Sequence, residues 1–307
     1  MRMAGRAAWL VVSVATTLMS ASCATAGPSM PSAGQLPRVL AAETFLGDIA
    51  QNVAGTRLTV ETLLRPGIDP HEFQLAPQDA IQIAQSQVLI VNGLGYETWL
   101  AKSLEGTGGQ RRVIIASTGL TPNSGPSGGH PEGDPHMWMD PLKVVQYVVN
   151  IRDGLSNADP AGAQAYTANA AAYMQQLNDL NLWIESQVAQ LPPAKRLLVT
   201  NHDALGYFAE AYGFKVVGAV IPNVTNEASP SAKQMADLIQ TVKSSSAPAI
   251  FLDTSENQNL ANQIASETGA KVITGLYVET LSAKDGAAPT YIDMMKYDVS
   301  AIVAALR

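Results

Sequence analysis

The chain has 307 residues, of which 47% are hydrophobic and 15% are charged. This length suits one large domain or two lobes with a core each, and the hydrophobic fraction excludes wholesale disorder. The formal net charge is -7, and no run of lysine and arginine occurs. Such a balance disfavours nucleic acids and anionic lipid surfaces as partners.

The first 22 residues have the layout of a secretory signal peptide. Arg2 and Arg6 give a positive start, an apolar run from Ala7 to Met19 follows, and small residues come next. The run is too short for a permanent membrane span. We therefore expect residues 1–22 to be removed and the protein to be exported to the periplasm or the cell surface.

The single cysteine, Cys23, directly follows this segment. One cysteine excludes an intramolecular disulfide and a cysteine-based zinc cluster. The stretch Ser20-Ala21-Ser22-Cys23 resembles a bacterial lipobox, although leucine usually stands where this chain has Ser20. We expect acylation of Cys23 and a lipoprotein anchored to the membrane, with ordinary cleavage after Ala26 as the alternative. Residues 23–36 are rich in Pro, Gly and Ser and predict a flexible tether.

From residue 37 onward, short β-branched runs alternate with helical periods. Strands are expected at Arg38–Ala42, Leu58–Leu64, Val88–Asn92, Arg111–Ala116, Arg196–Asn201, Lys215–Val220, Ala249–Asp253 and Lys271–Gly275. Helices are expected near 44–54, 76–86, 96–105, 204–212, 231–245, 258–268 and 290–306. The pattern predicts two α/β lobes, residues 37–159 and 192–307, each with a mainly parallel sheet covered by helices.

Residues 160–191 form a sustained helical pattern between these lobes. Asp159 suits the N-cap, Pro160 suits the first helical position, and Pro192-Pro193 closes the pattern. One apolar stripe runs along it, made of Tyr166, Tyr173, Leu177, Leu180, Ile184, Val188 and Leu191. A helix of this length extends ~48 Å and is long enough to brace both lobes.

Three of the four histidines follow predicted strands. His71 comes after the second strand, His136 after the fourth and His202 after the fifth. Parallel sheets bind ligands at the carboxyl ends of their strands. The triplet Asp-Pro-His occurs twice, and because proline stiffens the turn, each histidine is presented rigidly. The three imidazoles predict a site for zinc, copper or nickel rather than for calcium or magnesium.

A fourth ligand is expected from the second lobe. Its strand ends offer Asp253, Glu256 and Glu279, and position alone leaves all three open. Asp140 and Asp203 are candidates to hold the imidazole N–H groups in place. Trp138 is expected to have a packing role.

Four stretches of the chain resemble motifs of the zinc/manganese solute-binding proteins, which serve ATP-binding-cassette (ABC) metal importers. They are Asp69-Pro-His71-Glu-Phe, Asp134-Pro-His136-Met-Trp-Met-Asp-Pro141, Asn201-His202-Asp-Ala-Leu-Gly-Tyr-Phe208 and Leu276-Tyr-Val-Glu-Thr-Leu-Ser282. The resemblance covers residues 37–307. It implies two pseudo-symmetric α/β lobes, each with a four-stranded mainly parallel sheet flanked by helices, joined by one long helix.

The resemblance further implies that His71, His136, His202 and Glu279 bind the metal ion between the lobes. The family commonly has aspartate where this chain has Glu279, and glutamate is one methylene longer. The implied function is that of a receptor, not an enzyme. It captures the ion outside the cytoplasm as a monomer and delivers it to an ABC permease with its ATPase.

Metal identity rests on the donor atoms. Manganese receptors of this family often carry glutamate where this chain has His202, and three nitrogens with one carboxylate favour Zn²⁺ over Mn²⁺. Manganese remains the alternative. Zinc receptors often have a His-rich loop before the second motif, but here residues 121–133 hold only His130. We expect His130 to be a solvated loop residue, with a weak auxiliary metal site as the alternative.

Two other functions are compatible with parts of the sequence. A zinc-dependent hydrolase could use the three histidines, with Glu279 as general base. The chain lacks His-Glu-x-x-His and phosphate-loop patterns, which disfavours that function. A surface adhesin, a role attributed to some relatives, has no support beyond the expected membrane tether.

Overall fold

The computed structural model describes residues 36–100, 104, 111–123, 132–221, 230–254 and 258–307. The expected signal peptide, Cys23 and His130 lie outside these residues, so the predictions made for them stay predictions. Within the described ranges, none of the helices combines the length and the apolar character that a membrane span requires.

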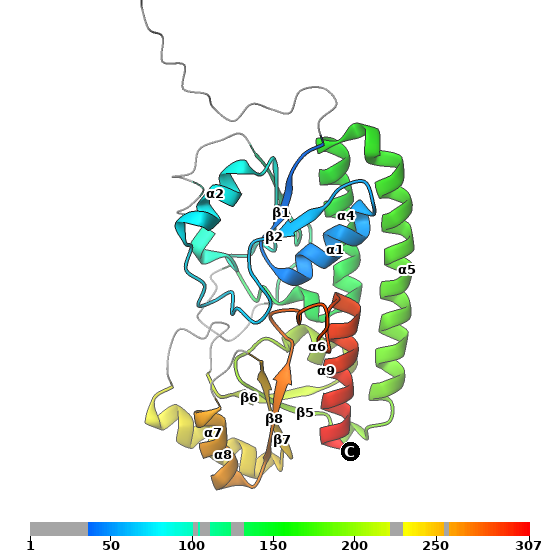
Figure 1. The fold of residues 1–307 in the computed structure, drawn as a ribbon. Coiled ribbons are helices and arrows are strands. Elements are labelled where there is room, and N and C mark those ends of the chain that lie inside the picture. Colours follow the sequence, from blue (N-terminus) through cyan, green and yellow to red (C-terminus); the bar gives the residue numbers. More distant parts are fainter. Residues whose placement is uncertain (1–35, 101–103, 105–110, 124–131, 222–229, 255–257) are drawn as a thin grey trace, which may run out of the picture.

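Two four-stranded sheets form the centre of the fold, one in each half of the chain (Figure 1). The first has the order β2-β1-β3-β4 and the second the order β6-β5-β7-β8, and the strands that pair within each are parallel. The strands are β1 (Val39–Ala41), β2 (Val60–Thr62), β3 (Val88–Val91), β4 (Arg112–Ile115), β5 (Leu197–Thr200), β6 (Lys215–Ala219), β7 (Ala249–Asp253) and β8 (Lys271–Leu276). The equal strand order confirms the predicted pseudo-symmetric α/β fold.

Helices connect the strands and cover the sheets. They are α1 (Thr44–Ala54), α2 (Pro77–Gln85), α4 (Pro141–Ala158), α5 (Ala163–Val188), α6 (Gly206–Tyr212), α7 (Ala232–Ser245), α8 (Asn259–Thr268) and α9 (Tyr291–Leu306). Of the helix expected near 96–105, residues 98–100 and 104 are helical. Three of the four inner strands, β1, β3 and β7, are buried along their whole length, and β5 is buried except at its partly exposed first residue, Leu197. Such burial is typical of a parallel sheet covered on both faces.

The long helix α5 runs alongside both halves of the molecule, with α4 and α9 beside it (Figure 1). Every residue of its predicted apolar stripe is buried. These side chains belong to one continuous core that also includes Val39 and Ile90 of the first sheet and Leu198 and Phe251 of the second. The two lobes therefore share a core along α5.

The start of α5 differs from the expected one. Residues Pro160–Gly162 form a 3₁₀ turn, and the α-helix begins at Ala163. Asp159 accepts hydrogen bonds from Arg57 and from the Tyr166 hydroxyl, so its carboxylate anchors this corner instead of capping the long helix. The 26 residues of α5 extend ~39 Å, which is still enough to reach both sheets.

Helix α4 is absent from the elements predicted above. It begins with an N-cap, since the Asp140 carboxylate accepts a hydrogen bond from the Leu142 amide at 2.9 Å and Pro141 occupies the first turn. Its buried face consists of Val144, Tyr147, Val148, Ile151 and Leu155. The capping residues and the helical spacing of these apolar residues are both present in the sequence.

Candidate metal centre

The loops that follow four strands bring together all four residues implied by the resemblance. His71 follows β2, His136 follows β4, His202 follows β5, and Glu279 follows β8. Each offers one donor atom, and these atoms lie within 4.8 Å of one another. All four side chains are buried. Residues separated by up to 208 positions in the chain thus form one compact cluster between the sheets.

The three imidazoles face one oxygen of the glutamate. Oε1 of Glu279 lies 2.9 Å from Nε2 of His202, 3.2 Å from Nε2 of His136 and 3.9 Å from Nε2 of His71. The imidazole ring centroids are 5.3 to 5.7 Å apart. In a tetrahedral zinc site with bonds of about 2.0–2.1 Å, donor atoms stand roughly 3.3 Å apart. The distances from Oε1 of Glu279 to the three Nε2 atoms are close to this value, so small side-chain shifts would give a tetrahedral site.

Each Asp-Pro-His triplet holds its own histidine. Oδ1 of Asp69 accepts the His71 amide hydrogen at 2.8 Å, and Oδ1 of Asp134 accepts the His136 amide hydrogen at 2.9 Å. Asp134 Oδ1 also lies 2.8 Å from Nδ1 of His136, which directs Nε2 toward the cluster. The prediction that Asp140 holds an imidazole is wrong, because its carboxylate caps α4.

The loop that carries Glu279 is fixed by side chains from both lobes. Asp253 Oδ2 accepts hydrogen bonds from the backbone amides of Val278 at 2.7 Å and Glu279 at 3.2 Å. Trp138 Nε1 donates to the Val278 carbonyl at 2.8 Å. Asp253, one of the candidate ligands, therefore supports the glutamate loop, while Glu256 lies outside the described residues.

Tyr96 is a site residue that none of the sequence motifs marks. Its hydroxyl donates a hydrogen bond to Oε2 of Glu279, and its side chain is buried. The signal available in the sequence was its place after β3, another strand that ends at this edge. Trp138 is also fully buried and stacks on Phe45 with ring centroids 4.4 Å apart, so it packs as expected.

The electrostatics of the cluster favour a cation. Burial alone opposes ionisation of Glu279, but the imidazoles of His136, His202 and His71 outweigh it and hold the pKa of this carboxyl well below its usual range. Burial likewise lowers the pKa of His136, but Glu279 and Asp134 outweigh it and raise that pKa to about 10. Both shifts show that the negative charge of Glu279 favours a positive charge among the imidazoles, and a divalent cation would supply one.

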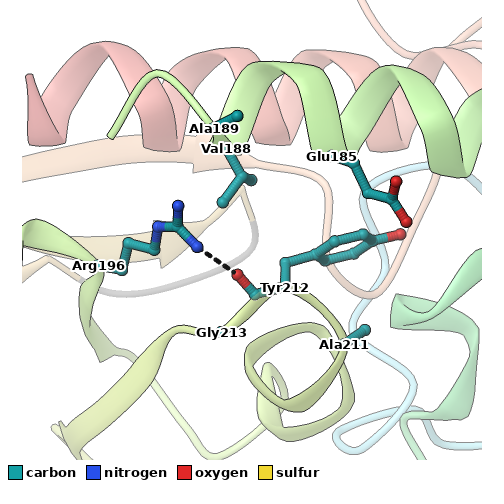
Figure 2. Close-up of a pocket in the computed structure, with 7 residues that line it drawn as sticks. All are labelled: Glu185, Val188, Ala189, Arg196, Ala211, Tyr212 and Gly213. Atoms are coloured by element: carbon teal, nitrogen blue, oxygen red, sulfur yellow. Dashed lines mark hydrogen bonds between the residues drawn. The ribbon is translucent and has the colours of Figure 1, made fainter. Parts of the chain in front are cut away.

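A hollow of about 400 Å³ lies at the C-terminal end of α5, beside α6 (Figure 2). Arg196 points across it and donates hydrogen bonds to the carbonyls of Tyr212 and Leu191 at 3.2 Å each. The nearby Glu185 accepts a hydrogen bond from Asn181 at 2.9 Å. The polar groups of this hollow serve the local fold, and none of them belongs to the four-residue cluster.

Comparisons with known proteins agree with this geometry. Residues 39–305 match the family model described as zinc-uptake complex component A, periplasmic. A manganese-binding lipoprotein, MntA, from Halalkalibacterium halodurans is 34% identical over 94% of this chain and 95% of its own. The iron-binding protein YfeA from Yersinia pestis is 31% identical over 97% of this chain and 95% of its own.

Solved structures show the same fold. The manganese-bound periplasmic metal binding protein from Candidatus Liberibacter asiaticus has a TM-score of 0.79 and 33% identity, and covers 88% of this chain and 100% of its own. The periplasmic zinc binding protein TroA from Treponema pallidum has a TM-score of 0.80 and 26% identity, over 89% of this chain and 99% of its own. From its matched length and its two-lobe fold, the chain belongs to the zinc-uptake complex component A family of metal-binding receptors for ABC importers.

Proposed function

We propose that this receptor captures Zn²⁺ in preference to Mn²⁺, with His71, His136, His202 and Glu279 as its four ligands. The observation that carries the proposal is the convergence of four buried donor atoms within 4.8 Å, two from each lobe. Buried histidines and carboxylates at this spacing are far more costly to a fold without an ion than with one.

The preference for zinc follows from the donor set. Three imidazole nitrogens and one carboxylate oxygen form the tetrahedral environment that Zn²⁺ adopts, whereas Mn²⁺ favours more oxygen donors. The names of the relatives do not favour one metal, because they include manganese-, iron- and zinc-binding proteins. The proposal therefore depends on the ligands of this chain.

Delivery would follow the pattern of ABC importers. We propose that the exported protein, acylated at Cys23 and tethered by residues 23–36, acts as a monomer and hands its ion to a permease driven by an ATPase. Support for the anchor comes from relatives named as lipoproteins, which match over 90% or more of this chain. The alternative of a zinc hydrolase has no support, since the family consists of receptors.

The proposal is tested on protein purified without added metal and then stripped by a chelator. Isothermal titration with Zn²⁺ should give one site per chain, and competition with Mn²⁺ should leave zinc bound. His71→Ala, His136→Ala and His202→Ala should each weaken zinc binding by at least 100-fold, because each removes one of four ligands.

His130→Ala is the matched control, since His130 is expected to be a solvated loop residue, and it should bind zinc as the parent protein does. Binding of zinc that survives any one of the three ligand substitutions would remove that residue from the proposed site. Tighter binding of Mn²⁺ than of Zn²⁺ by the parent protein would overturn the metal assignment.

A further inference from the structure

We propose that Tyr96 is a positioning residue that restricts Glu279 to one metal-binding oxygen and thereby favours zinc over manganese. This inference rests on the proposed function, because it assumes that Glu279 is a ligand. It assigns the choice between metals to a residue that does not itself touch the ion.

The two oxygens of Glu279 have different neighbours. Oε1 faces all three imidazoles, with Nε2 of His202 only 2.9 Å away. Oε2 accepts the hydrogen bond of the Tyr96 hydroxyl. While this bond lasts, Oε2 is held at the Tyr96 hydroxyl, so Oε1 is the oxygen that faces an ion among the imidazoles.

Tyr96 has little freedom to release Glu279. Its ring is fully buried and lies in edge contact with His71 at a centroid distance of 5.1 Å and beside Trp138 at 4.9 Å. The neighbouring residue, Glu97, is also buried and accepts hydrogen bonds from the backbone amides of Asn92 at 2.5 Å and Gly93 at 3.2 Å.

These bonds close the turn that carries the tyrosine. Gly93, Leu94 and Gly95 within it all have positive φ angles, of 91°, 55° and 68°. Two of these positions are glycines, for which such a conformation carries no side-chain penalty, so the chain can adopt this turn without steric strain at either position. The hydroxyl of Tyr96 is thus placed by the backbone as well as by the packing of its ring.

The length of Glu279 makes this contact relevant to metal choice. The additional methylene relative to aspartate lets a flexible carboxylate turn and bind an ion through both oxygens. Bidentate binding would raise the coordination number, which Mn²⁺ tolerates well and which a tetrahedral Zn²⁺ site does not need. Because Tyr96 holds Oε2, the site keeps three nitrogens and one oxygen.

The test substitutes Tyr96→Phe, which keeps the ring among the imidazoles and removes only the hydroxyl. We expect the ratio of Zn²⁺ to Mn²⁺ affinity, measured by competition titration, to fall about tenfold, as is usual when a group that orients a ligand is lost. Co²⁺ serves as a spectroscopic probe. The strong visible absorption of four-coordinate Co²⁺ in the parent protein should weaken in the variant as the coordination number rises.

Two further variants separate this role from a structural one. Tyr212, labelled in Figure 2, has another buried hydroxyl, which donates to Asn181 at 2.8 Å. Tyr212→Phe removes this hydroxyl and should change neither measurement. Glu279→Asp shortens the side chain by one methylene and should draw the carboxylate away from the Tyr96 hydroxyl, so adding Tyr96→Phe to it should leave the affinity ratio unchanged.

An unaltered affinity ratio and Co²⁺ spectrum in Tyr96→Phe would overturn the inference. An equal effect of Tyr96→Phe in the Glu279→Asp background would also overturn it, because Tyr96 would then influence metal choice through a group other than Glu279. Neither result would contradict the proposed function. That proposal fails instead if the parent protein binds no zinc or if the histidine substitutions are harmless.

Discussion

At the scale of single residues, the geometry of the site depends on acids that stand beside the ligands. Asp134 bonds both the amide and Nδ1 of His136. We expect Asp134→Asn to weaken zinc binding about tenfold, because the amide holds the imidazole less firmly and makes it a poorer donor. Titration calorimetry checks this against Asp153→Asn, which alters a carboxylate that is 58% exposed on α4. Equal zinc affinity in all three proteins would show that Asp134 has no such role.

The sequence identifies residues of the site better than it identifies their partners. The three histidines were found because each follows a strand, and parallel strands end at one edge. The roles of Asp134 and Tyr96 depend on where a side chain points after a turn, which spacing along the chain does not encode. Glu279 could be chosen over Asp253 only from the resemblance, since both stand at the end of a strand.

At the scale of elements, the contact between α1 and α9 includes a carboxylate that is poorly solvated. Asp48 Oδ2 accepts the Tyr291 amide hydrogen at 3.0 Å, and burial, aided by Asp293, raises the pKa of Asp48 to about 6. This pKa lies above that of the unfolded chain. The charged form of Asp48 therefore destabilises the fold above pH 6, and the penalty fades as the pH falls toward 4.

Asp48→Asn should consequently raise the free energy of unfolding at pH 8, by up to about 3 kcal/mol for a shift of roughly two pKa units. The amide oxygen can still accept the Tyr291 hydrogen bond. Chemical denaturation of the metal-free protein at pH 8 and pH 4.5 measures the gain, which should be largest at the higher pH. A variant less stable than the parent at pH 8 would contradict this account.

The strands were predicted within one or two residues of their bounds because apolar, β-branched runs are short and separated by turns. Helix α4 was missed even though Asp140 and Pro141 mark its start. These two residues also close the motif Asp134–Pro141 that carries His136, so one stretch of sequence holds both a metal-site signal and a helix cap. The corner at Asp159 could not be foreseen either, because its partner Arg57 is 102 residues away.

At the scale of the whole molecule, the lobes are joined by polar contacts as well as by their common core. Thr44 at the start of α1 accepts a hydrogen bond from the Leu281 amide at 2.8 Å, and Thr280 accepts one from the Gly67 amide at 3.1 Å. These bonds, with that of Trp138, attach the Glu279 loop of the second lobe to the first. Lobe separation would have to break them.

Thr44→Val should therefore speed release of zinc without removing a ligand. Loss of one buried hydrogen bond of about 1 kcal/mol corresponds to a dissociation rate roughly five times faster. Stopped-flow transfer of zinc to a chelator measures this rate. Thr241→Val, on the exposed face of α7, is the control and should release zinc at the parent rate. If Thr44→Val also releases zinc at the parent rate, this contact has no role in release.

The two-lobe architecture itself was the most predictable feature, since the order of strands and helices repeats in each half and a long amphipathic pattern separates them. The shared core was not predicted, because contacts between α1, α5 and α9 depend on how the halves are placed against each other.

The central claim is that four side chains from four loops bind one divalent cation. Crystals of the zinc-loaded protein, measured at the zinc absorption edge, test it most directly. We expect one anomalous peak at about 2.0–2.2 Å from Nε2 of His71, His136 and His202 and from Oε1 of Glu279. A peak elsewhere, or one bonded to fewer than three of these residues, would contradict the account.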